Sequence, residues 1–350
     1  MENKIENFIL EQLSQMANRI RTNYRKSNHK EIAAQKNNNP FRPFSGKNAT
    51  ITKKYMYLSR SFDSQLGNRL QKICGYIARC KYGNAAVPNY LFIKASSNNK
   101  KIELKLFSYP QKFLDIYSAY GFDGCNTTHL KPIDDKTDIS KLITNKIINI
   151  VKTEYRHKNK IKAIIKPEDK ENVATILKYW EKKFRSCIIE YSYDNCSEEQ
   201  IQNINNIGDN GLPIDLIYFT DKNNVFLYEL KSSGALDTKN KIGNANEVID
   251  NEKLFSFLGN VHSFFATYYN YSGEFGEKAI TDKGVTFRGN FPQGPMFNSA
   301  TKENDMDKKI IVGSIFWEKI LPKKITYRKL IEIYTNAFKK SGIESIIDDL

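Results

Sequence analysis

The sequence predicts an α/β (α+β) fold in which helices flank a mixed central sheet. Two runs, residues 214–220 and 225–231, are apolar on both faces, which predicts central strands covered by helices on both sides. Segments with apolar residues at helical spacing precede and follow these runs. No period of about 20 to 50 residues repeats and no heptad pattern is sustained, so the sequence argues against a solenoid and a long coiled coil.

The N-terminal part is predicted to be a helical extension of the sheet domain. Apolar positions from Ile5 to Ile20 predict a helix over residues 3–22. The Asn/Lys-rich stretch that follows contains Pro40 and Pro43 and indicates a basic connecting arm. We therefore expect an N-terminal helix and basic arm over residues 1–54, and one domain with helical additions over residues 55–350.

The elements of this larger domain follow from caps, apolar spacing and short apolar runs. A helix over residues 61–80 has Ser59 or Ser61 near its start and apolar residues on one face. Pro167 and two acids favour the first turn of a later helix. The remaining predicted strands cover residues 90–94, 102–107, 187–191 and 310–312, and the predicted helices cover residues 139–153, 167–184, 246–270, 314–320 and 326–339, with a further helix starting near residue 197.

The charge balance favours a polyanionic partner. The chain has 54 Lys and Arg residues against 39 Asp and Glu residues, a formal net charge of +15. No stretch approaches the roughly 18 apolar residues of a spanning helix, and the first residues do not have the pattern of a secretory signal. We expect a cytoplasmic protein with no membrane partner. The 5 scattered cysteines and 4 histidines lack the spacing of a disulfide framework or of a zinc site.

Three charged residues at the ends of the two apolar strands need an explanation, because an unpaired buried charge is costly. They are Asp215, Glu229 and Lys231. If Asp221 and Val225 close a three-residue loop, Asp215 faces Lys231, and all three charges share one face of the sheet. A four-residue loop would send Asp215 to the opposite face. An ion pair at a sheet edge is the alternative interpretation.

Two converging carboxylates suit a hard cation such as Mg²⁺, and a neighbouring lysine can orient or deprotonate a water molecule. This is the chemistry of phosphodiester hydrolysis. Glu103 and Lys105 form a competing pair with the same spacing on a predicted strand. This pair lacks an acid on the preceding strand, where Asn89 and Tyr90 stand instead.

The segments Pro213-Ile214-Asp215 and Glu229-Leu230-Lys231 resemble the PD-(D/E)xK nuclease signature, with one residue inserted after the proline. Their surroundings resemble type II restriction endonucleases, particularly the TdeIII-type group and relatives that cut GGNCC-like sites. The similar stretches are residues 59–68, 231–239, 311–317 and 326–330. The resemblance implies a restriction-endonuclease-like core for residues 55–350, with room for a DNA-recognition subregion.

The resemblance also implies roles for individual residues. Asp215 and Glu229 would hold Mg²⁺ together with the Leu230 carbonyl, and Lys231 would act on the attacking water. Related folds often add an acid from the early helix. Here Asp63 is the candidate, or there is none, because Gln71 stands at the expected position. Asp237, in the loop after the lysine, is interpreted as a capping residue.

Basic residues predict the contacts with DNA, since Lys and Arg neutralise phosphates and Arg reads guanine edges. The candidates are Lys54, Arg60, Arg69, Lys239 and Arg288. Double-stranded DNA is the expected substrate, a homodimer the expected assembly, and a cognate DNA methyltransferase the expected partner of the same system. Two alternatives stay open, a PD-(D/E)xK nuclease for repair or branched DNA and a non-enzymatic basic nucleic-acid-binding protein.

Overall fold

The computed structural model describes residues 1–26, 49–88, 90–108, 128–129, 188–206, 213–221, 223–231, 238–269, 279–280, 286–287 and 309–348. Within these ranges a four-stranded mixed sheet has the strand order β11-β8-β7-β6. Strand β6 (Leu216–Asp221) is antiparallel to β7 (Asn224–Lys231). Strands β8 (Asn260–Thr267) and β11 (Ile310–Val312) continue the sheet in parallel.

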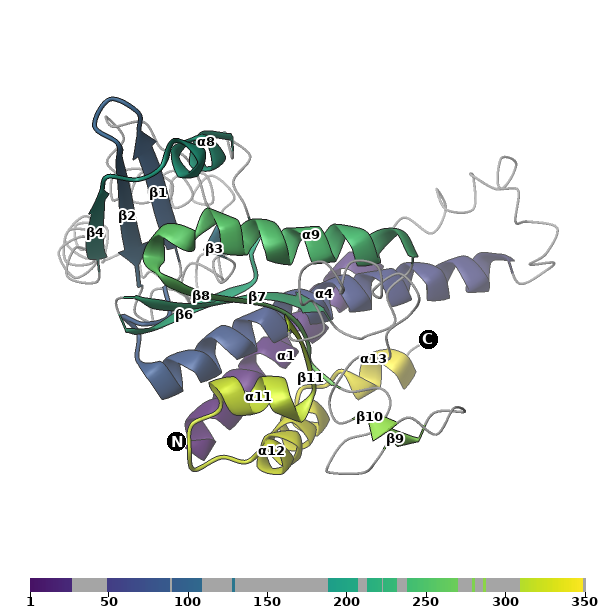
Figure 1. The fold of residues 1–350 in the computed structure, drawn as a ribbon. Helices are drawn as coiled ribbons and strands as arrows, with labels where there is room; N and C mark the ends of the chain where they lie inside the picture. Colours follow the sequence, from purple (N-terminus) through teal and green to yellow (C-terminus); the bar gives the residue numbers. More distant parts are fainter. Residues whose placement is uncertain are drawn as a thin grey trace, which may run out of the picture.

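Helices cover both faces of this sheet (Figure 1). Helices α1 (Glu2–Lys26), α4 (Ala49–Tyr82), α11 (Ser314–Ile320) and α12 (Tyr327–Lys340) share one apolar cluster with the sheet. Helix α9 (Thr238–Leu254) lies across the other face and contacts β7 and β8. The mixed sheet, its flanking helices and the N-terminal helix confirm the predicted α/β (α+β) fold class and are consistent with the predicted core.

Alternation of side chains explains how two layers can pack on one strand. On β6, Leu216 and Tyr218 belong to the cluster with α1 and α4, whereas Ile217 and Phe219 belong to a second cluster on the opposite face. Strand β7 is central as predicted, because it lies between β6 and β8. Within the described residues strand β6 lies at the edge of this sheet, which differs from the prediction that both strands are central.

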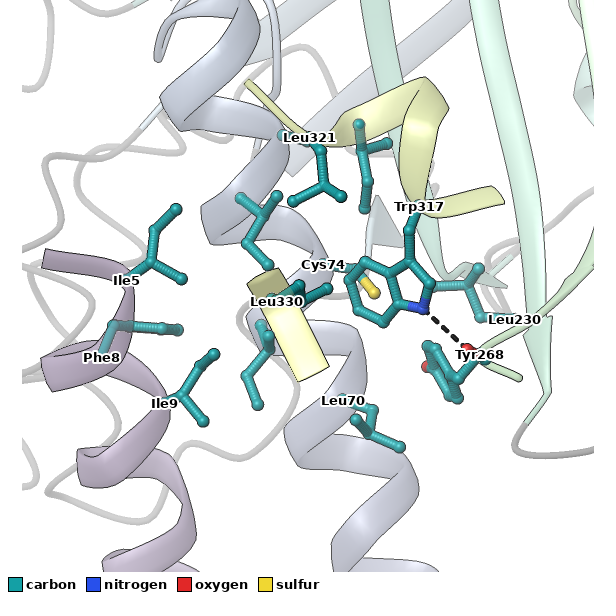
Figure 2. Packing of buried hydrophobic residues seen from close by; sticks show 14 of the residues in the cluster. Ile5, Phe8, Ile9, Leu70, Cys74, Leu230, Tyr268, Trp317, Leu321 and Leu330 are labelled. Atoms are coloured by element: carbon teal, nitrogen blue, oxygen red, sulfur yellow. Dashed lines mark hydrogen bonds between the residues drawn. The ribbon is translucent and has the colours of Figure 1, made fainter. Parts of the chain in front are cut away.

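The first cluster contains neighbouring aromatic side chains next to the end of β8. Figure 2 shows Trp317 beside Tyr268, with the indole Nε1 donating a hydrogen bond of 2.7 Å to the Tyr268 carbonyl. Leu70 and Cys74 of α4 lie in the same region. Trp317 is 5% exposed and is a core residue.

A second sheet is antiparallel and has the order β1-β2-β4, with bounds Tyr90–Ser96, Lys101–Phe107 and Ile188–Asp194. Helix α8 (Glu198–Asn206) contacts β1. The competing acid-lysine pair lies on β2, where Lys105 makes a 3.0 Å ion pair with the exposed Glu190 of β4. Glu103 makes a 3.6 Å ion pair with Lys101. The competing pair is therefore a set of ion pairs along a partly exposed sheet.

The remaining described elements are short. They are the strand pairs β3 (Thr128–His129) with β5 (Pro213–Ile214) and β9 (Ala279–Ile280) with β10 (Thr286–Phe287), the 3-10 turn η6 (Ser256–Leu258) and helix α13 (Glu344–Asp348). Within the described ranges, no helix has the length and hydropathy that crossing a bilayer requires.

Two predicted elements have different bounds in the structure. Helix α4 begins at Ala49, before the predicted start at residue 61, and residues 49–60 contain no proline or glycine that would end a helix. The predicted helix over residues 246–270 is wrong beyond Leu254, because Gly259, with φ of 94°, precedes strand β8. The predicted helices over residues 139–153 and 167–184 lie outside the described residues.

Candidate active site

The turn between β6 and β7 sets which charges meet at the other end of the hairpin. Phe219 pairs with Val225, and an irregularity follows before Asp221 pairs with Asn224. The Asp221 side chain accepts a 2.9 Å hydrogen bond from the Asn223 amide, a local bond typical of tight turns. The predicted three-residue loop is therefore wrong, and the predicted register is out by two residues. A shift of two residues keeps every side chain on its face.

The corrected register places Asp215 level with Glu229 instead of Lys231, since Leu216 pairs with Tyr228. Asp215 itself lies at a bend between β5 and β6 and is buried. Its Oδ2 accepts a 2.8 Å hydrogen bond from the Leu230 amide of the neighbouring strand. Its Oδ1 accepts a 2.6 Å hydrogen bond from Nε2 of Gln71 on α4. Both oxygens of this carboxylate are thereby fixed.

Glu229 and Lys231 occupy alternate positions on β7 and form an ion pair. Glu229 is 5% exposed, whereas the lysine side chain is only half-buried and can reach solvent. Both residues interact electrostatically with Asp215. The structure thus brings together the three side chains that the sequence singled out.

A third acid, Glu247 on α9, was not found by sequence reasoning. Its carboxyl group hydrogen-bonds to Glu229 and interacts with Lys231. The only signal in the sequence is an acid in the helix that follows the Glu-x-Lys strand, beside positions such as Val248 that become buried. Periodicity could not show that this helix crosses back over the end of β7.

The electrostatics of the cluster reflect crowded carboxyl groups. Burial, and then the charge of Glu229, raises the pKa of Asp215 to about 8. The same two causes raise the pKa of Glu247 to about 7. Burial lowers the pKa of Lys231, but the charge of Glu229 and its hydrogen bond outweigh burial, so the pKa lies above its usual value. Negative charge is therefore in excess at this point.

Two buried residues of the apolar core, Cys74 and Tyr268, lie next to the charged cluster. Cys74 of α4 is fully buried, and burial followed by the charge of Asp215 raises the pKa of its thiol. Tyr268 is also buried near the acids, and its hydroxyl has no hydrogen-bond partner among the described residues.

Asp63, the predicted early-helix acid, is exposed and lies eight residues before Gln71, about 12 Å along the helix.

The donor set fits a hard divalent cation. Carboxylate and backbone oxygens are the ligands that Mg²⁺ prefers, and a divalent charge would relieve the crowding that raises both carboxyl pKa values. Among the residues described here, no group of three or more His, Cys, Asp or Glu side chains forms a complete metal site. A cation would therefore depend on two carboxylates together with backbone and water oxygens.

The predicted DNA contacts are less well placed. Arg69 is 4% exposed, and its Nη1 donates hydrogen bonds of 3.1 and 2.9 Å to Gln12 and Gln15 of α1. Burial, followed by the charge of Arg19, lowers its pKa to about 10. These contacts hold α1 against α4 and argue against a phosphate contact by Arg69. Three other candidates lie in helices, but their side chains are outside the described part: Lys54, Arg60 and Lys239. The residues Asp237 and Arg288 lie outside the described ranges.

A family model described as "Type II restriction endonuclease, HinfI" matches residues 137–337, more than half of the chain. The chain belongs to the HinfI family of type II restriction endonucleases. The part matched by the HinfI model includes Asp215, Glu229, Lys231 and Glu247, whereas Gln71 precedes it. No curated protein and no solved structure matches the chain. The resemblance to TdeIII-type enzymes and to GGNCC cutters stays a prediction.

Proposed function

We propose that this restriction endonuclease makes Mg²⁺-dependent, sequence-specific double-strand cuts in DNA by phosphodiester hydrolysis. The observation that carries the proposal is the meeting of Asp215, Glu229 and Lys231 at the ends of two adjacent strands. In a HinfI-family chain, two carboxylates and a lysine at one point are the groups that hydrolysis of a phosphodiester needs.

Asp215 and Glu229, with the Leu230 carbonyl, are the proposed ligands of Mg²⁺. When bound, the cation would offset negative charge on the scissile phosphate and on the leaving oxygen. The bend at residue 215 and the pairing of the Leu230 amide with its carboxylate support this assignment, because they hold the aspartate at the end of β7.

Lys231 is the proposed partner of the attacking water. Its ion pair with Glu229 keeps the ammonium group protonated, so it acts as a hydrogen-bond donor that orients the water and stabilises charge on the phosphate. The half-buried position of the side chain leaves it within reach of a substrate.

The proposed partners follow from charge and symmetry. A net charge of +15 suits double-stranded DNA, and a two-fold recognition site calls for a homodimer. A cognate DNA methyltransferase would protect the host chromosome. Lys54, Arg60, Lys239 and Arg288 remain the proposed DNA contacts.

Plasmid DNA incubated with the protein and Mg²⁺ tests this function. Discrete fragments are expected, and they should disappear with EDTA and in the Asp215→Ala variant. Smearing or structure-dependent nicking would favour a repair nuclease, and binding without cleavage in Mg²⁺ or Mn²⁺ would favour a non-enzymatic binding protein. The HinfI match favours the restriction endonuclease over both alternatives.

A further inference from the structure

Gln71 of helix α4 makes a side-chain hydrogen bond to the proposed active site. Its Nε2 lies 2.6 Å from Oδ1 of Asp215. The second carboxylate oxygen is held at 2.8 Å by the Leu230 amide, which belongs to a different element. One donor on a helix and one on a strand together fix both the plane and the rotation of the carboxylate. Each oxygen keeps a further lone pair that can point to a cation.

Helix α4 is well anchored at this point. Leu70 and Cys74, on either side of Gln71 in the sequence, are buried in the apolar cluster of the sheet. Arg69 is tied to α1 by two hydrogen bonds. The amide of Gln71 is therefore presented by a rigid support, as a group that orients a metal ligand must be.

The choice of an amide at position 71 fits the charge of the cluster. Three carboxyl groups, from Asp215, Glu229 and Glu247, already lie around the ammonium group of Lys231. A glutamate at position 71 would have the same length, but it would place a fourth carboxyl group against Asp215 and remove the hydrogen-bond donor. A glutamine supplies the donor without the charge.

We propose that Gln71 is a positioning residue of the active site, which orients the Asp215 carboxylate for the divalent cation. The proposal rests on the proposed function of Asp215 as a metal ligand. Gln71 lies before the residues matched by the HinfI model, and its position is set by the packing of α4 on the sheet.

The test compares Gln71→Leu and Gln71→Glu with the wild-type protein and with Gln12→Leu. Gln12 is a matched control because it is a buried glutamine that also supports α4, through Arg69, but does not contact Asp215. Three quantities are measured for each: the Mg²⁺ dissociation constant by calorimetry without DNA, the single-turnover cleavage rate as a function of Mg²⁺, and the midpoint of thermal unfolding.

Gln71→Leu should raise the Mg²⁺ dissociation constant and the half-saturating Mg²⁺ concentration by about 10- to 100-fold, the usual effect of losing a group that orients a metal ligand. DNA binding should be unchanged. In Gln71→Glu, Mg²⁺ should raise the unfolding midpoint by more than in the wild type, because the added carboxylate repels Asp215 until a cation binds. Gln12→Leu should lower the midpoint and leave Mg²⁺ affinity within about twofold.

The outcomes separate the two proposals. Wild-type Mg²⁺ affinity in Gln71→Leu, or an equal loss in Gln12→Leu, would overturn the role of Gln71 while leaving the nuclease function standing. If the wild-type protein cut no DNA, the proposed function would fail, and the calorimetric comparison would still decide whether Gln71 supports a cation site. Absence of Mg²⁺ binding by the wild type together with absence of Mg²⁺-dependent cleavage would overturn both.

Discussion

Replacing Asp215 by Asn should abolish cleavage and yet stabilise the metal-free protein. In the folded protein the pKa of Asp215 is raised from 3.8 to about 8. A carboxyl group that binds its proton more tightly when folded makes the folded state less favourable as pH rises between these two values. The metal-free wild type should therefore lose stability from about pH 4 to pH 8.

The magnitude follows from the pKa difference. About four units at 1.36 kcal/mol each give an upper bound of about 5 to 6 kcal/mol. Because Glu229 and Glu247 share the repulsion, we expect Asp215→Asn to stabilise the metal-free protein by about 2 to 4 kcal/mol at pH 8. The hydrogen bonds can persist: the Asn carbonyl accepts from the Leu230 amide, and Gln71 can rotate its own amide to accept from the Asn Nδ2.

The assay is urea denaturation at pH 5, 6, 7 and 8 in EDTA, repeated with Mg²⁺. The wild type should become less stable with rising pH in EDTA, and Mg²⁺ should restore stability most strongly at pH 8. Asp215→Asn should show a weaker pH dependence and little response to Mg²⁺. A variant that is less stable than the wild type at pH 8 in EDTA would refute the reasoning that carboxyl repulsion destabilises this site.

Three further predictions test other parts of the site. Lys231→Ala should abolish cleavage with DNA binding retained, whereas Lys105→Ala, from the other Glu-x-Lys pair, should cut normally; retained cleavage in the first would remove that lysine from the mechanism. The Mg²⁺ affinity of the wild type, measured by calorimetry, should rise by at least tenfold from pH 6 to pH 8, because the carboxyl groups with raised pKa values must lose protons; an affinity independent of pH would contradict this. Tyr268→Phe and Tyr193→Phe each remove a buried hydroxyl without a described partner, so neither variant should lower the midpoint of thermal unfolding. Only Tyr268→Phe, whose hydroxyl lies near Asp215, should alter Mg²⁺ binding. A fall of several degrees in the unfolding midpoint would show that the removed hydroxyl has a hydrogen-bond partner.

Much of the central sheet could be predicted because its strands carry strong local signals. Apolar residues on both faces of β7 require cover from both sides, and the structure has α4 and α9 there. The face shared by the three charges was also predicted, although the register was not. The face depends only on whether the shift is even or odd, whereas the register depends on an irregularity at Thr220 that no composition signal marks.

Strand β8 was missed because its residues suit two periods at once. The run around Phe264 and Phe265 has apolar residues at both helical and alternating positions, and a short run of this kind does not distinguish a strand from a helix. In the structure this run is a strand, because it pairs in parallel with β7 along the full length of β7. The resemblance places position 71 where related folds carry an acid, but the hydrogen bond of Gln71 to Asp215 could not be derived from the sequence. It joins residues 144 positions apart and depends on how α4 packs on the sheet.

The docking of α1 between α4 and α12 links helices far apart in the sequence to the charged cluster on β6 and β7. Lys340 reaches Glu6 at 2.7 Å, and Arg21 donates to the Gly342 carbonyl at 2.9 Å. The support of the helix that carries Gln71 is therefore complete only after the last helices have been synthesised and have folded back on the first. Nascent chains and fragments that end before α12 should therefore lack a correctly shaped cleavage centre, and activity should appear only once α12 has been made and has packed on α1.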